Sequence, residues 1–387
     1  MTTPTAARPA ERLTRLLTTI TTVKAPYQAA FFRIGLSTVV LAFLLREWPN
    51  RHVLYGNHSA LSFDLAQVLI REERTFTVLA WGDGGLWFET VYAVTIAAAV
   101  AVLLGWRTRG TSVLLMGGVL SVVNRNTLVG DGGDNVVRIM VIYLVLTRCA
   151  QVWSLDARRA RRRADLPGHD TTGLLLWAAA VAVLIPLSSY STPGWSLIFW
   201  TLWAVQGLWY AVGLRFPRHE ARAALDAAAS MLHNCAMLAI AAQVCLIYAT
   251  AGWYKIQGSR WQEGSALHYA LHLDYFTPWP ALSGFLAGST LMVLVLTYLT
   301  VMVQVAFPFT LANRRVKNVL LAVMIAEHLG IAVVLGIPFL SLAMVVCDAV
   351  FLPTAFLIAL GVRCGRLAAW LRALPPWEVR APREAAF

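Results

Sequence analysis

Ten apolar runs, each long enough to cross a lipid bilayer, dominate this chain. They lie near residues 29–47, 88–106, 111–129, 134–150, 172–190, 195–214, 229–252, 285–309, 318–336 and 338–361. About 20 residues of α-helix span the hydrocarbon core, and a helix satisfies its own backbone hydrogen bonds there. Only 13% of the residues are charged, against about 25% in soluble domains. The sequence predicts an all-α, polytopic integral membrane helix bundle of about nine or ten transmembrane helices, in which the tryptophan-rich run 195–214 either crosses or lies at the interface.

The basic residues indicate the same arrangement, because they fall in alternate connections between the runs. If the amino terminus lies in the cytoplasm and every run crosses, cytoplasmic segments receive the arginines of 107–109, 148–163, 215–222, 314–315 and 363–383. Cytoplasmic loops of membrane proteins carry an excess of Lys and Arg. We therefore expect both termini in the cytoplasm. The net charge of +12 then comes mainly from basic loops beside the apolar runs. We therefore expect the lipid bilayer as a partner and no nucleic acid.

This topology divides the chain into three parts. Residues 1–28 form a cytoplasmic basic segment that leads into a retained first helix. Residues 29–361 form the transmembrane bundle, and residues 362–387 form a cytoplasmic tail that lies at the membrane interface.

Two predicted external segments, 48–87 and 253–284, are long enough to hold structure of their own. Within the first, apolar residues between Phe63 and Trp81 alternate with charged ones. That pattern predicts an amphipathic helix on the membrane surface.

A polar cluster surrounds the predicted external turn between the third and fourth helices. The Asp-Gly-Gly-Asp sequence at 131–134 provides the turn, because glycine permits tight backbone conformations. The polar members of the cluster are Asn124, Arg125, Asp131, Asp134, Asn135 and Arg138. Carboxylates beside arginines are typical of a salt-bridged turn at the membrane surface, and they also fit a polar lining for a substrate or an ion.

Lys255 is unusual because this chain otherwise uses arginine. Of 32 basic side chains, only Lys24, Lys255 and Lys317 are lysine. Arginine is effectively never deprotonated, whereas a desolvated lysine can release its proton and act as a base. Lys255 lies at a predicted helix end between aromatic residues, where snorkelling lysines are also found. It is therefore either a candidate base or an ordinary interfacial lysine.

Polar residues within the later helices form a third group. Gln304 precedes Pro308, Glu327 and His328 lie in the predicted ninth helix, and Asp348 lies in the tenth. Such residues usually face a bundle interior or a cavity. They are typical of a proton relay around a polar cavity, and equally of interhelical hydrogen bonds worth ~1 kcal/mol each.

The cysteine and histidine patterns do not indicate a metal site. The five cysteines lie in or beside apolar runs without a C-x-x-C pair, so we expect packing residues rather than disulfides or thiolate ligands. His268 and His272 have i, i+4 spacing, but Tyr269 occupies the glutamate position of H-E-x-x-H. We predict no metal.

The segment around Lys255 resembles a known family. The sequence A-G-W-Y-K-I at 251–256, followed by W-Q-E-G-S-A at 261–266, is similar to the A-G-x-x-K-[LI]…W-x-x-G-x-[SA] segment of the HTTM family. That family groups the membrane half of vitamin K-dependent gamma-carboxylases with bacterial relatives. Further matches in the same order are Arg33, the polar turn at 124–135, Gln304 with Pro308, Glu327-His328 and Asp348. The resemblance covers about residues 29–352 and is greatest to bacterial members related to sporulation-delaying protein B.

The resemblance implies a mechanism, a cofactor and partners. In the carboxylases, the lysine that matches Lys255 is regarded as the base that deprotonates reduced vitamin K. A catalytic Lys255 and a reduced quinone are therefore implied, at the external face of a bacterial cytoplasmic membrane. A small secreted peptide, with membrane or accessory proteins encoded beside it, is the implied partner. The N-N-H-S-Y-L segment of the carboxylases has no match near the fourth helix, so we do not expect their substrate capture or carbon dioxide chemistry to carry over.

Three hypotheses follow from these residues. The first is a membrane enzyme or maturation factor that acts at the external face on a peptide or quinone, with Lys255 as base. The second is a non-enzymatic component for production, export or immunity of a secreted peptide. The third is an ion-coupled transporter with Glu327, His328 and Asp348 as its relay, although the chain shows no internal repeat of the kind common in transporters.

Overall fold

The computed structural model describes residues 18–163, 170–216 and 218–373. The chain forms two compact units, which meet in the sequence between Phe351 and Leu352. Helices and short 3₁₀ turns form all the regular structure of the described residues, without a strand. The predicted all-α class is therefore confirmed.

The longer helices follow the predicted apolar runs. In chain order they are α2 (Pro26–Glu47), α5 (Gly85–Leu104), α6 (Thr108–Arg125), α7 (Gly132–Val145), α9 (Thr171–Ala179), α10 (Val181–Tyr190), α11 (Pro193–Arg215), α12 (Glu220–Gln257), α16 (Thr290–Ala306), α17 (Arg314–Val334), α18 (Pro338–Asp348) and α19 (Thr354–Ala373). Shorter elements join them: α3 (Arg51–Leu54), α4 (Phe63–Glu73), η2 (Val78–Trp81), α8 (Leu155–Arg163), α13 (Ser259–Gln262), α14 (Ala266–Ala270), α15 (Pro280–Ala287), η4 (Phe307–Thr310) and η5 (Ala349–Phe351).

Seven helical stretches of the described chain are long and apolar enough to cross a membrane, or eight if Pro338–Phe351 and Thr354–Leu367 form one broken span. A membrane helix bundle is thus supported, but the predicted count of nine or ten is not reached. The helix α7 has only 14 residues, about 21 Å at 1.5 Å per residue. The predicted tenth run, 338–361, is interrupted after α18, where Pro353 precedes α19.

Two predicted segments differ from the structure. The amphipathic helix expected over 63–81 ends at Glu73, and the chain then turns inward. Leu65 in α4 is 50% exposed, as a surface helix requires, but Phe76 and Leu79 are buried at 2% and 4% exposure. The second expected external segment, 253–284, begins within α12, which continues through Gln257. Lys255 therefore lies in the last turn of α12, at a helix end as the sequence predicts.

The two predicted terminal segments lie partly outside the residues that the structure describes. Of the predicted basic segment 1–28, residues 1–17 lie outside the described residues, and α2 already begins at Pro26. Of the predicted tail 362–387, α19 covers the residues up to Ala373, and 374–387 lie outside the described residues.

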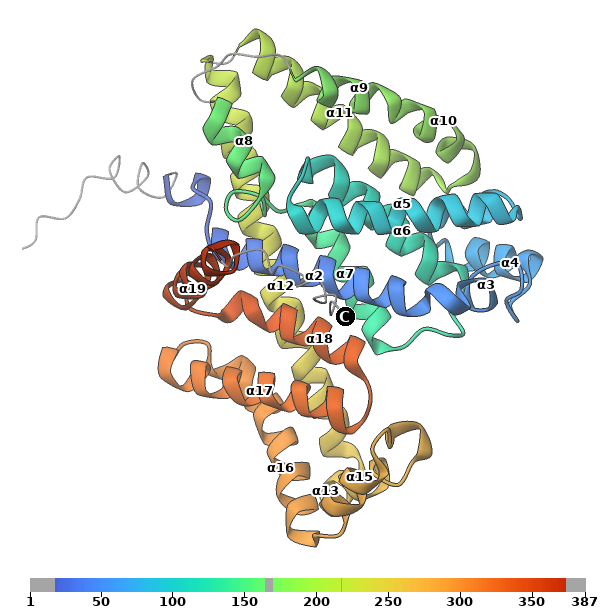
Figure 1. Ribbon diagram of the computed structural model, residues 1–387, viewed down its shortest axis with the longest axis vertical. Helices are drawn as coiled ribbons and strands as arrows, with labels where there is room; N and C mark the ends of the chain where they lie inside the picture. Colours follow the sequence, from blue (N-terminus) through green and yellow to red (C-terminus); the bar gives the residue numbers. More distant parts are fainter. Residues whose placement is uncertain (1–17, 164–169, 217, 374–387) are drawn as a thin grey trace, which may run out of the picture. The chain divides into compact units, whose positions relative to one another are not determined.

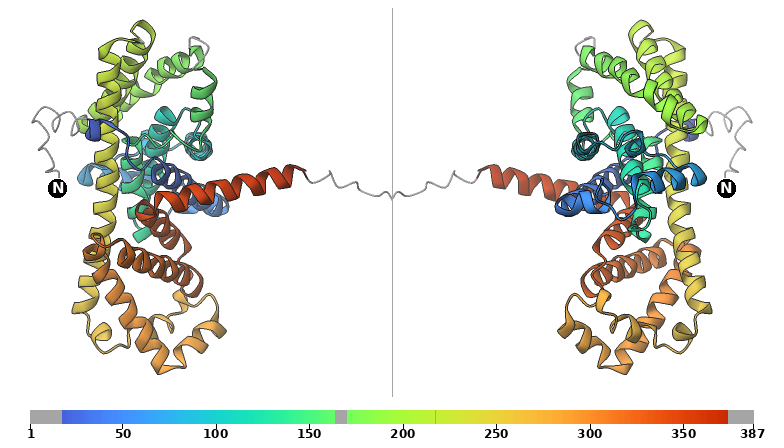
Figure 2. Two further views of the ribbon diagram at one scale, coloured as in Figure 1. Left: turned by 90° about the vertical axis from the view of Figure 1, so that its left-hand side faces the viewer. Right: turned by 90° about the vertical axis from the view of Figure 1, so that its right-hand side faces the viewer.

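The core of the first unit consists of α2, α5, α6, α7 and α18, which pack side by side (Figure 1). Their contacts bury large apolar side chains, including Phe32 and Leu36 of α2 and Leu115 of α6. Figure 2 shows α12 as a long rod beside this core, with α9–α11 at one end and α13–α16 at the other. At 38 residues, α12 is about 57 Å long, so this one helix reaches from α9–α11 at one end to α13–α16 at the other.

The pair α9 and α11 has few buried side chains and is joined by two tryptophans. The indole Nε1 of Trp177 donates to Trp203 O at 2.9 Å, and Nε1 of Trp203 donates to Trp177 O at 3.0 Å. The rings stack with centroids 4.3 Å apart. This exchange satisfies both polar N–H groups between two helices whose other faces are apolar.

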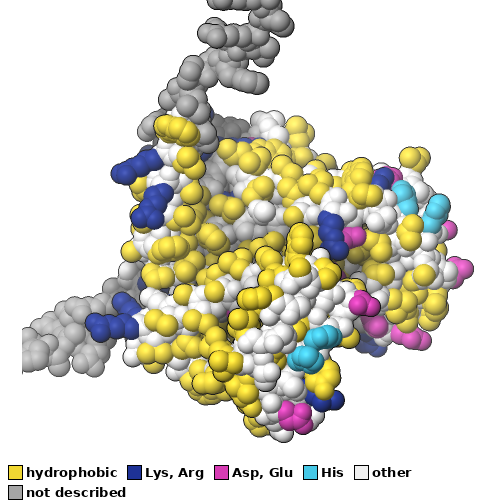
Figure 3. Space-filling view, turned by 60° about the horizontal axis from the view of Figure 1, so that its bottom comes forward, with side chains coloured by type: hydrophobic (Ala, Val, Ile, Leu, Met, Phe, Trp, Pro, Cys, Tyr) yellow, Lys and Arg dark blue, Asp and Glu magenta, His cyan; other side chains and the backbone are white. Residues whose placement is uncertain are grey.

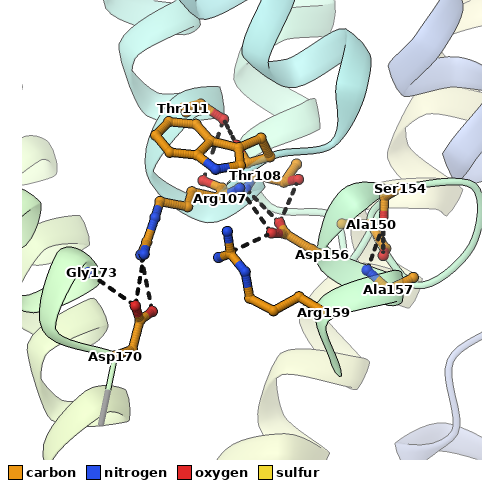
Figure 4. A network of polar contacts seen from close by, with 11 residues as sticks. Arg107, Thr108, Thr111, Ala150, Ser154, Asp156, Ala157, Arg159, Asp170 and Gly173 are labelled. Atoms are coloured by element: carbon orange, nitrogen blue, oxygen red, sulfur yellow. Dashed lines mark hydrogen bonds and ion pairs between the residues drawn. The ribbon is translucent and has the colours of Figure 1, made fainter. Parts of the chain in front are cut away.

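Polar contacts gather at the two ends of the helices in this unit. At one end, Asp156 in the first turn of α8 accepts from Arg107 N, Thr108 N and Thr108 Oγ1, while the Arg107 guanidinium binds Asp170 (Figure 4). At the opposite end, Glu89 pairs with Arg51 and His52 of α3. Figure 1 accordingly places α8 toward the left and α3 and α4 toward the right.

The surface between these ends is mostly hydrophobic. Figure 3 shows a broad apolar area, with Asp, Glu and His mostly toward its right. Exposed large apolar side chains occur along α10, α11, α12 and α16, for example Ile185, Leu197, Leu238 and Met302. An exposed apolar surface of this kind is what a bilayer requires of a protein that crosses it.

Candidate functional site

The amine of Lys255 is linked to a carboxylate through one side-chain amide. Lys255 Nζ donates to Oε1 of Gln304 at 2.8 Å, and Nε2 of Gln304 donates to Oε1 of Glu327 at 2.6 Å. The three residues come from α12, α16 and α17, and α16 packs against both of the other helices (Figure 1). This orientation of the amide satisfies both neighbours, because an ammonium only donates and a carboxylate only accepts.

Local sequence explains why α12 and α16 meet at this level. Gly252 lies one turn before Lys255, and a Cβ added there would lie 2.6 Å from Cγ2 of Val305. The missing side chain thus allows close approach next to Gln304. Pro308 lies in η4, directly after α16 ends at Ala306. Gln304 is therefore held in the last turn of α16, opposite the last turn of α12.

An aromatic ring lies beside the amine. Lys255 Nζ is 5.3 Å from the ring centroid of Trp261, which belongs to α13. Lys255 is half-buried, and a cation over an indole face gains electrostatic attraction. The amine therefore lies between an amide and an aromatic ring, and it does not extend freely into lipid or water.

A second polar cluster lies deeper in the same bundle. The hydroxyl of Tyr248 donates toward both carboxylate oxygens of Asp348, at 3.0 and 2.9 Å, and lies 3.0 Å from Nε2 of His328. Tyr248, Asp348 and His328 are 2%, 0% and 7% exposed. The cluster is thus enclosed by α12, α17 and α18, and at these atoms its members hydrogen-bond to one another.

The two clusters are related by helix geometry. Tyr248 and Lys255 are seven residues apart on α12, two turns along the same face. Glu327 and His328 are consecutive on α17 and direct one side chain to each cluster. The sequence-based candidates Lys255, Gln304, Glu327, His328 and Asp348 therefore all lie in one region of the bundle.

The polar turn is held by hydrogen bonds rather than by the expected ion pairs. Asp131 and Asp134 form a capping box at the start of α7, which binds the carboxylates to backbone N–H groups. Arg138 donates to Asn124 and Asn135, and Arg125 donates to Leu61 O. No ion pair within 4 Å joins these carboxylates to these arginines among the described residues.

Two cavities lie away from the Lys255 region. One of ≈ 350 Å³ is lined by Trp81, Gly82, Trp87, Ala182, Val183 and Pro186. One of ≈ 20 Å³ includes Asp134 and is otherwise mostly apolar. The hydrogen-bonded groups around Lys255 and Tyr248 are suited to proton transfer along the two clusters.

Tyr248 is the residue of this region that sequence reasoning did not single out. It is one of many aromatic residues, and nothing about a lone tyrosine in an apolar run indicates a hydrogen-bonding role. The usable signal was its spacing, since a polar group seven residues before Lys255 lies on the same helix face.

Comparisons with known proteins return nothing for this chain. No protein-family model, no curated protein and no solved structure matches it.

Proposed function

We propose that this chain is a multi-pass membrane enzyme, or an enzyme-like maturation factor, that uses Lys255 as a base. It acts at the extracytoplasmic face of a bacterial cytoplasmic membrane, with both termini in the cytoplasm, on a lipid-soluble reduced quinone or a secreted peptide. The observation that carries the proposal is the chain of hydrogen bonds from Lys255 through Gln304 to Glu327. The similarity of the 251–266 segment to the HTTM family supports the same role.

The amide between the two ionisable groups is suited to a base. A direct ion pair with Glu327 would hold the amine in its protonated form, because the opposite charges would lie in contact. Gln304 separates them, so the neutral amine keeps a lone pair for a substrate proton while one N–H stays on the amide. Once protonated, the ammonium still has Glu327 one amide away as a balancing charge.

The lysine itself is part of the argument. An arginine at this position would bind Gln304 equally well as a donor, but it could not release a proton. Only three of the 32 basic side chains are lysine. Lys317 offers a contrast, because its Nζ donates to the backbone carbonyl of Phe351 and has no ionisable partner in hydrogen-bond distance among the described residues.

The test compares two matched lysine variants. The wild-type protein in phosphatidylcholine nanodiscs is supplied with reduced vitamin K. Oxygen consumption is measured, because the resemblance to the carboxylases implies that oxygen adds to the deprotonated vitamin K. We expect Lys255→Arg to lose the protein-dependent oxygen consumption, while Lys317→Arg keeps it. An active Lys255→Arg protein, or consumption no greater than in empty nanodiscs for every form, would contradict the proposal.

A transporter is the second candidate, and the buried Tyr248–His328–Asp348 cluster favours it. In that case Glu327→Gln abolishes proton-coupled uptake of solute into proteoliposomes and Lys255→Arg is tolerated. The Lys255→Arg and Glu327→Gln variants therefore distinguish the enzyme from the transporter.

A further inference from the structure

The Tyr248 hydroxyl connects an acceptor and a ring nitrogen, and its single hydrogen limits how the three groups can be arranged. With Asp348 ionised, the hydroxyl donates to the carboxylate, at 3.0 and 2.9 Å from its two oxygens. Its oxygen then accepts from His328, so Nε2 of the imidazole must carry a hydrogen. A neutral imidazole with hydrogen on Nε2 leaves a lone pair on Nδ1.

That lone pair has no partner. Nδ1 of His328 is buried, and no hydrogen-bonding group of the described residues lies within reach of it. His328 as a whole is only 7% exposed. A buried polar atom without a partner costs free energy, so the unpaired Nδ1 of His328 calls for an explanation.

We propose that Tyr248, His328 and Asp348 form a proton-binding relay in which a proton enters at Nδ1 of His328 and is finally held by Asp348. As a hydronium ion from the solvent gives its proton to Nδ1 and leaves as water, the Nε2–H bond breaks and its proton passes to the Tyr248 oxygen. The original hydroxyl proton passes to the Asp348 carboxylate. One proton is gained, the imidazole is neutral before and after, and the negative charge of Asp348 is removed.

The arrangement of charges around the relay fits this end state. The titratable groups that face it are Glu327 and Lys255, together with the thiols Cys245 and Cys347. Lys255 is hydrogen-bonded through Gln304 to Glu327, and no ion pair of Asp348 with a cation is found among the described residues. Loading the relay with a proton therefore removes an unpaired charge from the bundle interior, whose burial is costly.

This relay is independent of the role of Lys255. It stores one proton whether the Lys255 cluster acts as a base or as a structural contact. Failure of the Lys255→Arg test therefore leaves it standing, and its own failure leaves the proposed base untouched.

The wild-type protein provides the first test. Nitrogen-15 labelling of histidine in detergent micelles, with the His328 signals assigned by their loss in His328→Gln, reports which ring nitrogen carries hydrogen. As the pH is lowered, we expect His328 to change from the Nε2–H to the Nδ1–H neutral form. A ring that stays in the Nε2–H form throughout the folded range, or that becomes doubly protonated, would overturn the relay.

Infrared spectroscopy provides the second test. The protonated-carboxyl band assigned by Asp348→Asn is expected to rise together with the His328 change in one step in the wild type. In Tyr248→Phe, which lacks the connecting hydroxyl, the two changes are expected to separate by at least one pH unit. Tyr298→Phe is the matched control, since its hydroxyl donates to Gln262 O elsewhere in the fold. Coincident steps in a folded Tyr248→Phe protein would refute the relay, and so would an Asp348 band that never responds to pH.

Discussion

Arg33 and Lys255 are both basic residues within helices of this chain, but the structure surrounds them differently. Arg33 is fully buried, and its guanidinium donates to four backbone carbonyls, those of Val102, Leu103, Cys149 and Trp153. Lys255 is half-buried and donates to one side-chain amide. The first site is fully occupied by backbone groups, whereas the second consists of side chains that can exchange protons.

The acceptors explain the difference. Val102 and Leu103 are at the end of α5, where carbonyls lack helical partners and the helix dipole is negative. A permanent positive charge therefore stabilises that end, and arginine supplies it with enough donors. The amine of Lys255 instead donates to a side chain, Gln304, which donates in turn to Glu327. The comparison sets a network of backbone carbonyls around Arg33 against a network of side chains around Lys255.

Replacing Arg33 is expected to have the largest effect on stability. Arg33→Met leaves buried carbonyls without a donor and removes the charge from the end of α5, which costs about 3–5 kcal/mol. The free energy of unfolding in detergent micelles measures this loss. Arg46→Met is the control, because Arg46 is exposed, and its contacts are an ion pair with Glu47 and the ring of Phe339. A loss below about 1 kcal/mol for Arg33→Met would show that its network does not hold the helices together.

Filling the gap at Gly252 is expected to affect function more than stability. Gly252→Val places atoms against Val305, which costs about 1–3 kcal/mol by overpacking and moves Gln304 away from Lys255. We expect the oxygen consumption of the reduced-quinone assay to fall at least tenfold. Gly330→Ala in α17 is the control, because nothing lies within 4 Å of a Cβ there. Unchanged activity in a folded Gly252→Val protein would argue against the Lys255–Gln304 contact.

Removing the Asp156 carboxylate tests another structural contact, with a smaller expected loss of stability than replacing Arg33. Asp156→Ala takes away the acceptor for two backbone N–H groups at the start of α6, a loss of about 1–2 kcal/mol by analogy with helix caps. Thermal unfolding in detergent should show a lower midpoint, with activity per folded molecule retained. Glu72→Ala, at an exposed site of α4, should leave the midpoint unchanged. An activity loss beyond the loss of folded protein would mean that the two networks are coupled.

The tryptophan pair between α9 and α11 is expected to contribute least. Trp177→Phe removes one of the two indole hydrogen bonds, which is worth about 0.6–1 kcal/mol in a membrane protein. Its free energy of unfolding should fall by that amount without a change in activity. A loss above about 2 kcal/mol would show that α9 and α11 depend on this contact far more than such bonds usually allow.

The fold class was predictable from the sequence, but helix continuity was not. Hydropathy locates apolar runs but does not show where a helix breaks within them. It therefore predicts one helix over 338–361, although Pro353 precedes α19 in the structure. The helix predicted over 63–81 is shorter in the structure, where α4 covers Phe63–Glu73, for a similar reason. Helical spacing continues through Phe76 and Leu79, but Arg74 adopts a left-handed backbone conformation that ends α4 and turns both residues into the core.

The candidate residues were predictable as types, but their pairing was not. Lys255, Gln304, Glu327, His328 and Asp348 were identified because polar groups are rare in apolar runs. That Gln304 would bridge Lys255 and Glu327 depends on how closely α12 and α16 approach, which a single glycine at 252 determines. The ion pairs expected at the 131–134 turn did not form, because the same carboxylates cap α7. The carboxylates accept hydrogen bonds from nearby backbone N–H groups and form no ion pair with the arginines.

The most direct measurement asks whether position 255 needs a titratable amine or only a positive charge. Lys255→Cys is purified in nanodiscs and treated with 2-bromoethylamine, which restores an amine of nearly lysine length, or with a trimethylammonium thiosulfonate, which restores only a fixed charge. Wild-type protein treated in parallel controls for the five native cysteines. A base at position 255 predicts that the amine restores oxygen consumption and the quaternary ammonium does not. Equal recovery with both reagents, or full activity of the untreated variant, would contradict it.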